Sequence, residues 1–374
     1  MLAMHMADQL LSLPVALISC IMAAGALAVA ARLSRRGLAG QQLPLMGVMG
    51  AFVFAAQMIN FPLPFLPGTS GHLSGGVLLA ILLGPWSGIV AMAGILIIQC
   101  LLFQDGGLLA LGCNIINMGI VPCLLGWGVY RLVLRGSPSG PRTYLGAWLG
   151  CLVGVTAGAA LVPLEAAASG VLRIPATDFL AVMVGVHLLI GTVEGLITFA
   201  VLAYLRQAYP VLLGFPASPA SGPMHAGKRT VAVSLLAVAL LLGGVVSWFA
   251  SSHPDGLEWS YSHHQYEGAG NPLGQPGAGV AAAEDLHSRI ALMPDYGQRP
   301  APLGQTAREP ATHPAGNGQP ANQTAAGQAT EATGVSGWKS LAGLTGTVLT
   351  LGVLYILSRA LRQRGDAGAS GPIN

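Results

Sequence analysis

Long runs without charged side chains are the feature that most constrains how this chain can fold. Several segments of about 17 to 25 residues carry one charge or none, the length an α-helix needs to cross a hydrocarbon core of ~30 Å. Only 8% of the residues are Asp, Glu, Lys or Arg, against about 25% in a typical soluble domain. So few charges cannot cover a water-exposed surface, and we therefore expect an all-α integral membrane protein.

The apolar runs predict nine helical segments. They lie at 10–31, 44–60, 73–84, 86–104, 107–130, 143–168, 179–205, 230–250 and 340–358. The third is short, and we expect it to be separated from the fourth at Gly84-Pro85, because proline cannot continue the hydrogen-bond ladder of the preceding helix. The pattern favours a bundle of about seven helices followed by two C-terminal transmembrane helices that flank a long outer loop.

A change in composition divides the chain. Residues 207–229 are rich in Pro, Gly, Ser and Ala, which is typical of a linker. The predicted parts are a membrane domain at 1–206, a cytoplasmic linker at 207–229, and a second domain at 230–364 with helices at 230–250 and 340–358. The outer loop at 251–338 is expected to be partly disordered, because 297–335 contains few large apolar residues.

The basic residues predict the orientation in the membrane. With the N-terminus outside, the inner loops hold twelve of the 17 Lys and Arg residues and the outer loops hold five, as the positive-inside rule requires. We therefore expect a multi-pass protein of a bacterial cytoplasmic membrane with its C-terminus in the cytoplasm. Lipid is its expected surrounding, and no nucleic-acid partner is indicated. Arg32, Arg35 and Arg36 follow the first apolar run, which is the wrong order for a cleaved signal peptide.

Two polar segments interrupt the apolar pattern. In NFPLPFLPGTSGHLSGG, residues 60–76, three prolines fix an extended path and four glycines permit conformations closed to other residues. We expect a rigid outer loop that presents His72, either as a ligand or as a capping or interfacial histidine. In QDGGLLALGCNIINMG, residues 104–119, Asn114 and Asn117 share one helix face and are expected to point into the bundle. They either join helices or support metal ligands from behind.

Three further ionisable residues lie within predicted helices: Glu165, His187 and Glu194. Such residues indicate either a functional pathway or a network that stabilises the fold. The five cysteines all fall in apolar helices without a CxxC pair, which favours packing over a zinc site or disulfides. The chain has no Walker A motif, so we expect no ATP hydrolysis by this chain and no enzymatic activity.

The N-terminal MHM suggests a metal chelator. In a chain that begins at Met4, the α-amine, the main-chain nitrogen of His5 and the His5 imidazole can close two chelate rings around one metal. A nitrogen of His72 would complete a square plane, the geometry that Cu(II) and Ni(II) prefer, and imidazole also suits cobalt. Calcium and magnesium require oxygen ligands and would be rejected.

Four segments resemble a known family. MHMADQLLS, NFPLPFLPGTSGHLSGGVLLAILLGPWSG, QDGGLLALGCNIINMG and HLLIGTVEGLIT are similar to signature segments of the CbiM/NikM proteins, the substrate-binding (S) components of energy-coupling factor (ECF) transporters for cobalt and nickel. This similarity runs through residues 4–205. Further on, SSHPDGLEW, MPDY and SLAGLTGTVLTLGV resemble the PDGLE-type NikN component, so that the chain resembles a NikMN fusion.

The resemblance implies a function and a ligand set. Ni²⁺ or Co²⁺ would be the transported substrate, with nickel favoured because PDGLE-type components resemble the nickel systems. The ligands would be the amine of Met4, the main chain and side chain of His5, and His72, with Asn60, Asn114 and Asn117 as supporting residues. The partners would be a membrane coupling protein of the CbiQ/NikQ kind and ATPase subunits of the CbiO/NikO kind. No organic cofactor is implied.

Some alternatives stay open. The family begins at Met-His, whereas Met1-Leu2-Ala3 comes first here, so we expect that translation starts at Met4; trimming and a different binding mode are the alternatives. The PDGLE segment either captures metal or docks on the first domain; its polar cluster is His253, Asp255, Glu258, His263 and His264. Functionally, the rivals are a membrane metal sensor or scaffold that does not transport, and a stand-alone carrier.

Overall fold

The computed structural model describes residues 5–37, 43–135, 140–213, 227–262, 273–297 and 337–369. Within these residues, six helices are long and apolar enough to cross a membrane. They comprise α1 (Leu13–Gly37), α4 (Pro85–Phe103), a composite helix at 111–134, α7 (Gly140–Ser169), α8 (Ala176–Ala208) and α12 (Gly337–Ala369). Two shorter apolar helices are α2 (Leu43–Gln57) and α9 (Lys228–Gly244). The prediction of an all-α membrane protein is confirmed.

Two helices deviate from regular geometry where the sequence contains Gly or Pro. The helix α3 (Gly76–Leu83) ends at Gly84, whose φ of 83° places it in the left-handed region, and Pro85 begins α4. The predicted break at Gly84-Pro85 is therefore present. The composite helix starts as α5 (Leu111–Asn114), widens into π-helical turns at Ile115–Ile120 and Pro122–Gly126, and ends as α6 (Trp127–Leu134). Such wide turns accommodate a proline in a helix interior, where it cannot donate a hydrogen bond.

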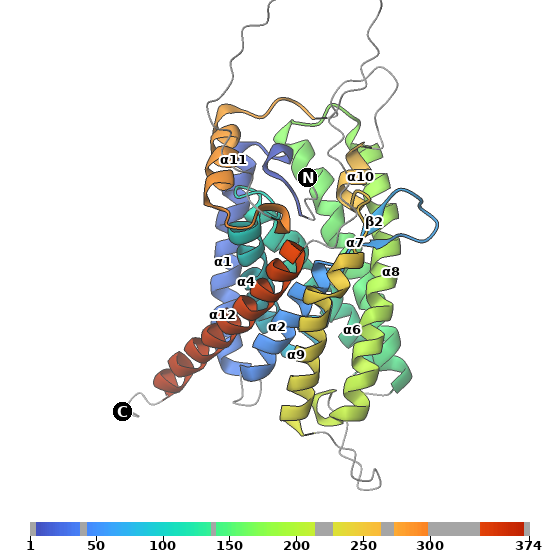
Figure 1. Ribbon diagram of the computed structural model, residues 1–374, viewed down its shortest axis with the longest axis vertical. Coiled ribbons are helices and arrows are strands. Elements are labelled where there is room, and N and C mark those ends of the chain that lie inside the picture. Colours follow the sequence, from blue (N-terminus) through green and yellow to red (C-terminus); the bar gives the residue numbers. More distant parts are fainter. Residues whose placement is uncertain are drawn as a thin grey trace, which may run out of the picture.

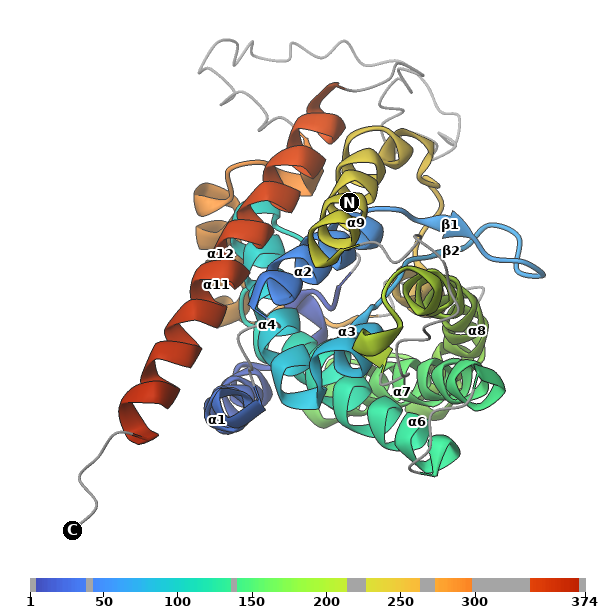
Figure 2. The same cartoon turned by 90° about the horizontal axis from the view of Figure 1, so that it is seen from below.

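Glycines allow the helices of the first domain to pack closely. Gly195 of α8 lies against Trp148 of α7, and a Cβ at Gly191 would lie 3.1 Å from Leu152. Helices α6, α7 and α8 form one side of the bundle, and α12 lies on the opposite side (Figure 2). This use of small residues is typical of helix pairs in membranes, where van der Waals packing replaces the hydrophobic effect as the main contact energy.

The second domain packs along the first. Helix α12 crosses α2 and α4, with Leu354 over Gly50 and Gly94, and Phe54 of α2 lies against Gly346. Helix α9 packs against both α2 and α12, and it ends at Gly244, before a one-turn helix at Val246–Phe249. The predicted helix at 230–250 is therefore shorter, and a separate turn follows it.

The segment between α9 and α12 contains structure that the sequence patterns did not predict. Helices α10 (Gly256–Ser262) and α11 (Ala278–Ile290) and a turn at Pro294–Tyr296 lie at the same end of the bundle as the N-terminal segment (Figure 1). Residues 263–272 and 298–336 lie outside the described residues, and so does nearly all of the segment predicted to be disordered. Most of the predicted linker, 214–226, also lies outside them.

Candidate metal-binding site

The loop that carries His72 is a short β-hairpin, and the residues that follow it are hydrogen-bonded to helix α8. Strands β1 (Phe61–Pro62) and β2 (Ser70–Gly71) pair antiparallel, and His72 follows β2 directly. Just beyond it, the carboxyl group of Glu194 on α8 accepts the main-chain N–H groups of Ser74 and Gly75 at 2.7 and 3.0 Å. Glu194 is fully buried. The sequence left open whether Glu194 belongs to a functional pathway or stabilises the fold. In the structure it stabilises the fold, because it fixes the loop that presents His72.

The N-terminal segment is held against the loop between α4 and α5. Asn114 binds the main chain of Met6 twice, because its Oδ1 accepts the Met6 N–H at 3.0 Å and its Nδ2 donates to the Met6 carbonyl at 3.1 Å. The N–H of Gly107 donates to the same carbonyl at 2.9 Å, and Asp8 Oδ1 accepts the N–H of Ala110 at 2.9 Å. These bonds fix the position of His5, the residue before Met6.

Two glycines make room for this segment. Gly106 has a φ of 85°, and a Cβ there would lie 2.8 Å from the Cβ of His5. A Cβ at Gly107 would overlap the carboxylate of Asp8 and lie 2.5 Å from its main-chain nitrogen. Contacts this short do not occur between real side chains, so the Gly-Gly pair is what allows the N-terminal segment to approach.

His5 is bonded to a buried carboxylate. Its Nδ1–H donates to Asp105 Oδ1 at 2.7 Å, and the hydroxyl of Tyr296 donates to Asp105 Oδ2 at 2.6 Å. The exposed fractions are 2% for His5, 3% for Asp105 and 8% for Tyr296. Burial alone would raise the pKa of Asp105, but the charge and hydrogen bond of His5 and the hydroxyl of Tyr296 hold it below its ordinary value.

His5 and His72 line the same cavity. Their ring centroids are 5.7 Å apart and the rings are inclined by 51°. Nε2 of His5 is buried and has no hydrogen-bond partner among the described residues. The cavity has a volume of about 70 Å³, and Asn114, Asn117, His187 and Asp255 also line it. Burial raises the pKa of Asp255, while the charge of the nearby His72 opposes that effect. The site therefore brings together an available imidazole nitrogen, a second imidazole and polar groups in a space large enough for an ion.

The structure brings together some of the predicted site residues. His5, His72, Asn114 and Asn117 line one cavity, whereas Met4 lies outside the described residues. Asn117 also donates to Glu165 Oε2 at 2.8 Å. Asn60 lines a different cavity with Tyr296 and Lys339, and its main-chain oxygen accepts the N–H of Ser251 at 2.7 Å.

The three-nitrogen chelate would require a change at His5. Only Nδ1 can close a six-membered ring with the residue's own main-chain nitrogen and a metal, because Nε2 lies on the far side of the imidazole. In the structure Nδ1 is bonded to Asp105. A metal that binds as the sequence predicts must therefore take the place of that hydrogen bond.

Two site residues escaped the sequence reasoning: Asp105 and Tyr296. Asp105 lies in the segment QDGGLLALGCNIINMG, but the sequence patterns assign it no role at the site. One signal was available, because a carboxylate beside Gly-Gly stands out in a chain with 8% charged residues. Tyr296 is 191 positions away from Asp105, and no periodic pattern connects residues at such a distance.

The PDGLE segment docks on the His72 hairpin. Ser70 donates its N–H to the carbonyl of Pro254 and its hydroxyl to that of His253, both at 2.8 Å. Asp255 Oδ1 accepts the N–H of Glu258 at 2.7 Å and so caps α10. These contacts support the alternative in which the PDGLE segment docks on the first domain. His263 and His264 lie outside the described residues.

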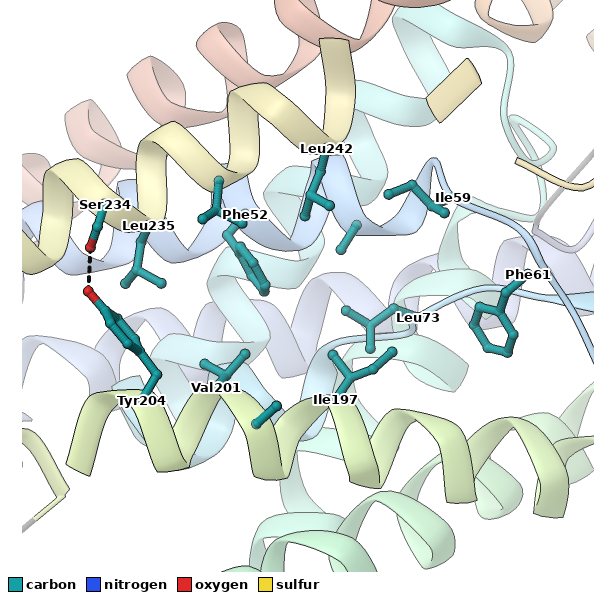
Figure 3. Close-up of a pocket in the computed structure, with 13 residues that line it drawn as sticks. Phe52, Ile59, Phe61, Leu73, Ile197, Val201, Tyr204, Ser234, Leu235 and Leu242 are labelled. Atoms are coloured by element: carbon teal, nitrogen blue, oxygen red, sulfur yellow. Dashed lines mark hydrogen bonds between the residues drawn. The ribbon is translucent and has the colours of Figure 1, made fainter. Parts of the chain in front are cut away.

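A larger cavity of about 530 Å³ lies between α2, α8 and α9 (Figure 3). Its walls are almost entirely apolar, including Phe52, Leu73, Ile197 and Leu242, and its polar contact is the 2.6 Å hydrogen bond between Tyr204 and Ser234. Such walls offer no ligand set for a cation, which is why the smaller cavity is the candidate site.

Fold and site together define a multi-pass membrane protein in which two histidines face one buried cavity. The model of the family "Cobalt uptake substrate-specific transmembrane region" (CbiM) matches residues 5–212, and that of the PDGLE domain matches residues 229–363. This chain belongs to the CbiM family of cobalt and nickel transport proteins and carries a PDGLE domain, which confirms the resemblance noted in the sequence.

Two fused relatives agree with this assignment, and a solved structure is similar to part of the chain. A putative fused nickel transport protein NikMN of Archaeoglobus fulgidus is 39% identical over 254 residues, which cover 67% of this chain and 80% of that protein. The fused nickel transport protein NikMN of Rhodobacter capsulatus is 34% identical over 291 residues, 72% of this chain and 82% of that protein. A solved crystal structure of a transition metal transporter is 30% identical, with a TM-score of 0.49, over 56% of this chain and 97% of that one.

Proposed function

We propose that this chain is the substrate-binding subunit of an ECF-type importer. It binds Ni²⁺, or Co²⁺, at the outer face between His5 and His72 and carries the ion across the cytoplasmic membrane. A CbiQ/NikQ-like coupling protein and CbiO/NikO-like ATPase subunits drive the step. The N-terminus faces outward and the C-terminus faces the cytoplasm, as the distribution of basic residues requires.

One observation carries the proposal: in a cavity shared with His72, the buried Nε2 of His5 has no partner in the part of the chain that the structure describes. Leaving a buried polar atom without a partner costs about 1–3 kcal/mol, and a bound cation would remove that cost. Imidazole nitrogen suits nickel and cobalt and discriminates against calcium and magnesium. Nickel is favoured over cobalt because the fused relatives are named for nickel transport.

Two imidazoles need further donors to make a tight site. Among the described residues, no group of three or more His, Cys, Asp or Glu side chains could hold a metal ion. The remaining donors would therefore come from the main chain: the amine of Met4 and the main-chain nitrogen of His5. That chelate uses Nδ1 of His5 in place of Nε2 and breaks the bond to Asp105, whereas binding through Nε2 keeps that bond. Intact-mass measurement of the expressed protein tests whether the chain begins at Met4. A chain that retains Met1 and still binds nickel tightly would contradict the amine ligand.

The binding test is a Ni²⁺ titration of the purified full chain by isothermal calorimetry. His5→Ala and His72→Ala should each abolish high-affinity binding, since each removes an imidazole, while the thermal unfolding midpoint stays close to that of the wild type. Near-normal affinity in either variant would remove that residue from the site.

The transport test uses cells that co-express the chain with coupling and ATPase subunits. We expect nickel uptake that requires all components. Binding without uptake in the complete system would favour the sensor or scaffold, and uptake by this chain alone would favour the stand-alone carrier.

A further inference from the structure

Apart from the docking of the PDGLE segment on the His72 hairpin, the second domain reaches His5 through the hydroxyl group of Tyr296. Tyr296 belongs to the PDGLE region, and it donates to the carboxylate of Asp105, whose other oxygen accepts Nδ1–H of His5. The three groups form a continuous buried chain from the second domain to the candidate ligand. Buried polar chains of this kind hold each member in one orientation, since any movement leaves a polar atom without a partner.

The position of Tyr296 is fixed independently of its hydroxyl. Its ring stacks on Phe103 of α4 with centroids 4.8 Å apart and planes inclined by 16°. Just before it, the N–H of Met293 donates to the carbonyl of Leu102 at 2.9 Å, so the turn is tied to the end of α4 that leads into Asp105.

The turn also has an uncommon backbone conformation. Asp295 and Tyr296 both have positive φ, 50° and 56°, a region that few residues other than glycine enter. Such a conformation costs free energy and persists where surrounding contacts impose it. Here it accompanies the delivery of the Tyr296 hydroxyl to Asp105.

Asp105 lies next to any ion that His5 binds. When Nε2 of His5 is the ligand, the carboxylate stays bonded to Nδ1 of the same imidazole. A buried negative charge in this place attracts the cation, and a carboxylate that fixes a histidine ring is a recurrent partner of metal-binding histidines.

On the basis of the proposed function, we infer that Tyr296 is a positioning residue for metal binding: it holds Asp105, and Asp105 orients His5 and supplies the negative charge beside the ion. The second domain is then part of the binding site, and the affinity of the first domain depends on it. Removing such supporting partners typically weakens metal binding ten- to a hundredfold.

The test compares two tyrosines of the full chain. Tyr296→Phe removes only the hydroxyl and keeps the stacking on Phe103. The matched control is Tyr204→Phe, which removes another hydroxyl that bonds across the domain interface, to Ser234 at 2.6 Å, beside the apolar cavity. Affinity is measured by calorimetric titration with Ni²⁺, and the ligand geometry by the visible absorption spectrum of the bound nickel, which a purely structural role would leave unchanged.

We expect Tyr296→Phe to weaken nickel binding about tenfold or more and to alter the spectrum, with Tyr204→Phe within twofold of the wild type. Asp105→Asn should weaken binding further, and the double variant should be no weaker than Asp105→Asn alone, because both act through one chain of bonds.

Three results would overturn the inference: wild-type affinity in Tyr296→Phe, equal losses in Tyr296→Phe and Tyr204→Phe, or additive losses in the double variant. If Tyr296→Phe does not fold, Asp105→Asn decides, and wild-type or tighter binding by that variant rejects the inference. Failure of the wild-type chain to bind nickel would instead refute the proposed function. Normal binding by the wild type and loss in His72→Ala, with no effect of Tyr296→Phe, would refute only this inference.

Discussion

The double hydrogen bond from Asn114 to Met6 yields a prediction whose size can be worked out. Asn114→Leu keeps the side-chain volume but removes both bonds, each of which contributes about 1 kcal/mol net. The Met6 carbonyl keeps its bond from Gly107, whereas the Met6 N–H loses its acceptor, Asn114 Oδ1, which adds about 1–2 kcal/mol. The docked N-terminal segment would therefore lose about 3–4 kcal/mol.

This loss should appear in metal binding, because His5 precedes Met6 and binds only from the docked position. Since 1.4 kcal/mol corresponds to a factor of ten, the lower figure predicts an affinity about a hundredfold weaker once undocking dominates. Calorimetric Ni²⁺ titration measures the affinity, and hydrogen exchange at the amides of Met6 and Gly107 measures docking.

The control is Asn117→Leu, an equal substitution in the same cavity. It removes the bond to Glu165 and leaves the N-terminal segment untouched, so exchange at Met6 and Gly107 should stay slow. Fast exchange in Asn114→Leu combined with wild-type affinity would refute the link between docking and binding, and slow exchange in that variant would refute the clamp itself.

Two further variants test the supports of the site. Gly107→Ala should weaken nickel binding at least tenfold because its Cβ would collide with Asp8. The control Gly128→Ala, which has open space around it, should bind normally. Equal affinities of the two variants would contradict the close approach of the N-terminal segment to Gly107. Glu194→Gln replaces one acceptor oxygen by a donor NH₂ group facing the Ser74 or Gly75 N–H, so we expect faster amide exchange at these residues and a loss of stability of about 1–3 kcal/mol in thermal melts; unchanged exchange would show that the loop is held by other contacts.

Much of the fold follows from local sequence. The nine predicted apolar segments are all helical in the structure, with ends shifted by up to eleven residues. Their length and lack of charge are local properties, and a bilayer forces each such run to satisfy its own backbone hydrogen bonds as a helix. The break at Gly84-Pro85 and the non-helical loop before His72 follow from proline and glycine in the same way.

The sequence patterns did not predict helices α10 and α11, because no local apolar run marks them. They are short, at 7 and 13 residues, and neither has an apolar run of membrane length. They are defined by docking against the hairpin at Ser70 and the end of α4, where His287 donates to the Cys100 carbonyl at 2.8 Å.

The sequence by itself determined the membrane class, the order of the helices and the two histidines, because these depend on runs, prolines and motifs read along the chain. Only the tertiary structure decided which groups surround His5. Asn114 reaches it over 108 positions through Met6, Asp105 over 100 positions, and Tyr296 over a further 191. Hydrogen bonds between such distant residues exist only because helix packing brings three loops and two domains to one end of the bundle, and no local pattern encodes that meeting.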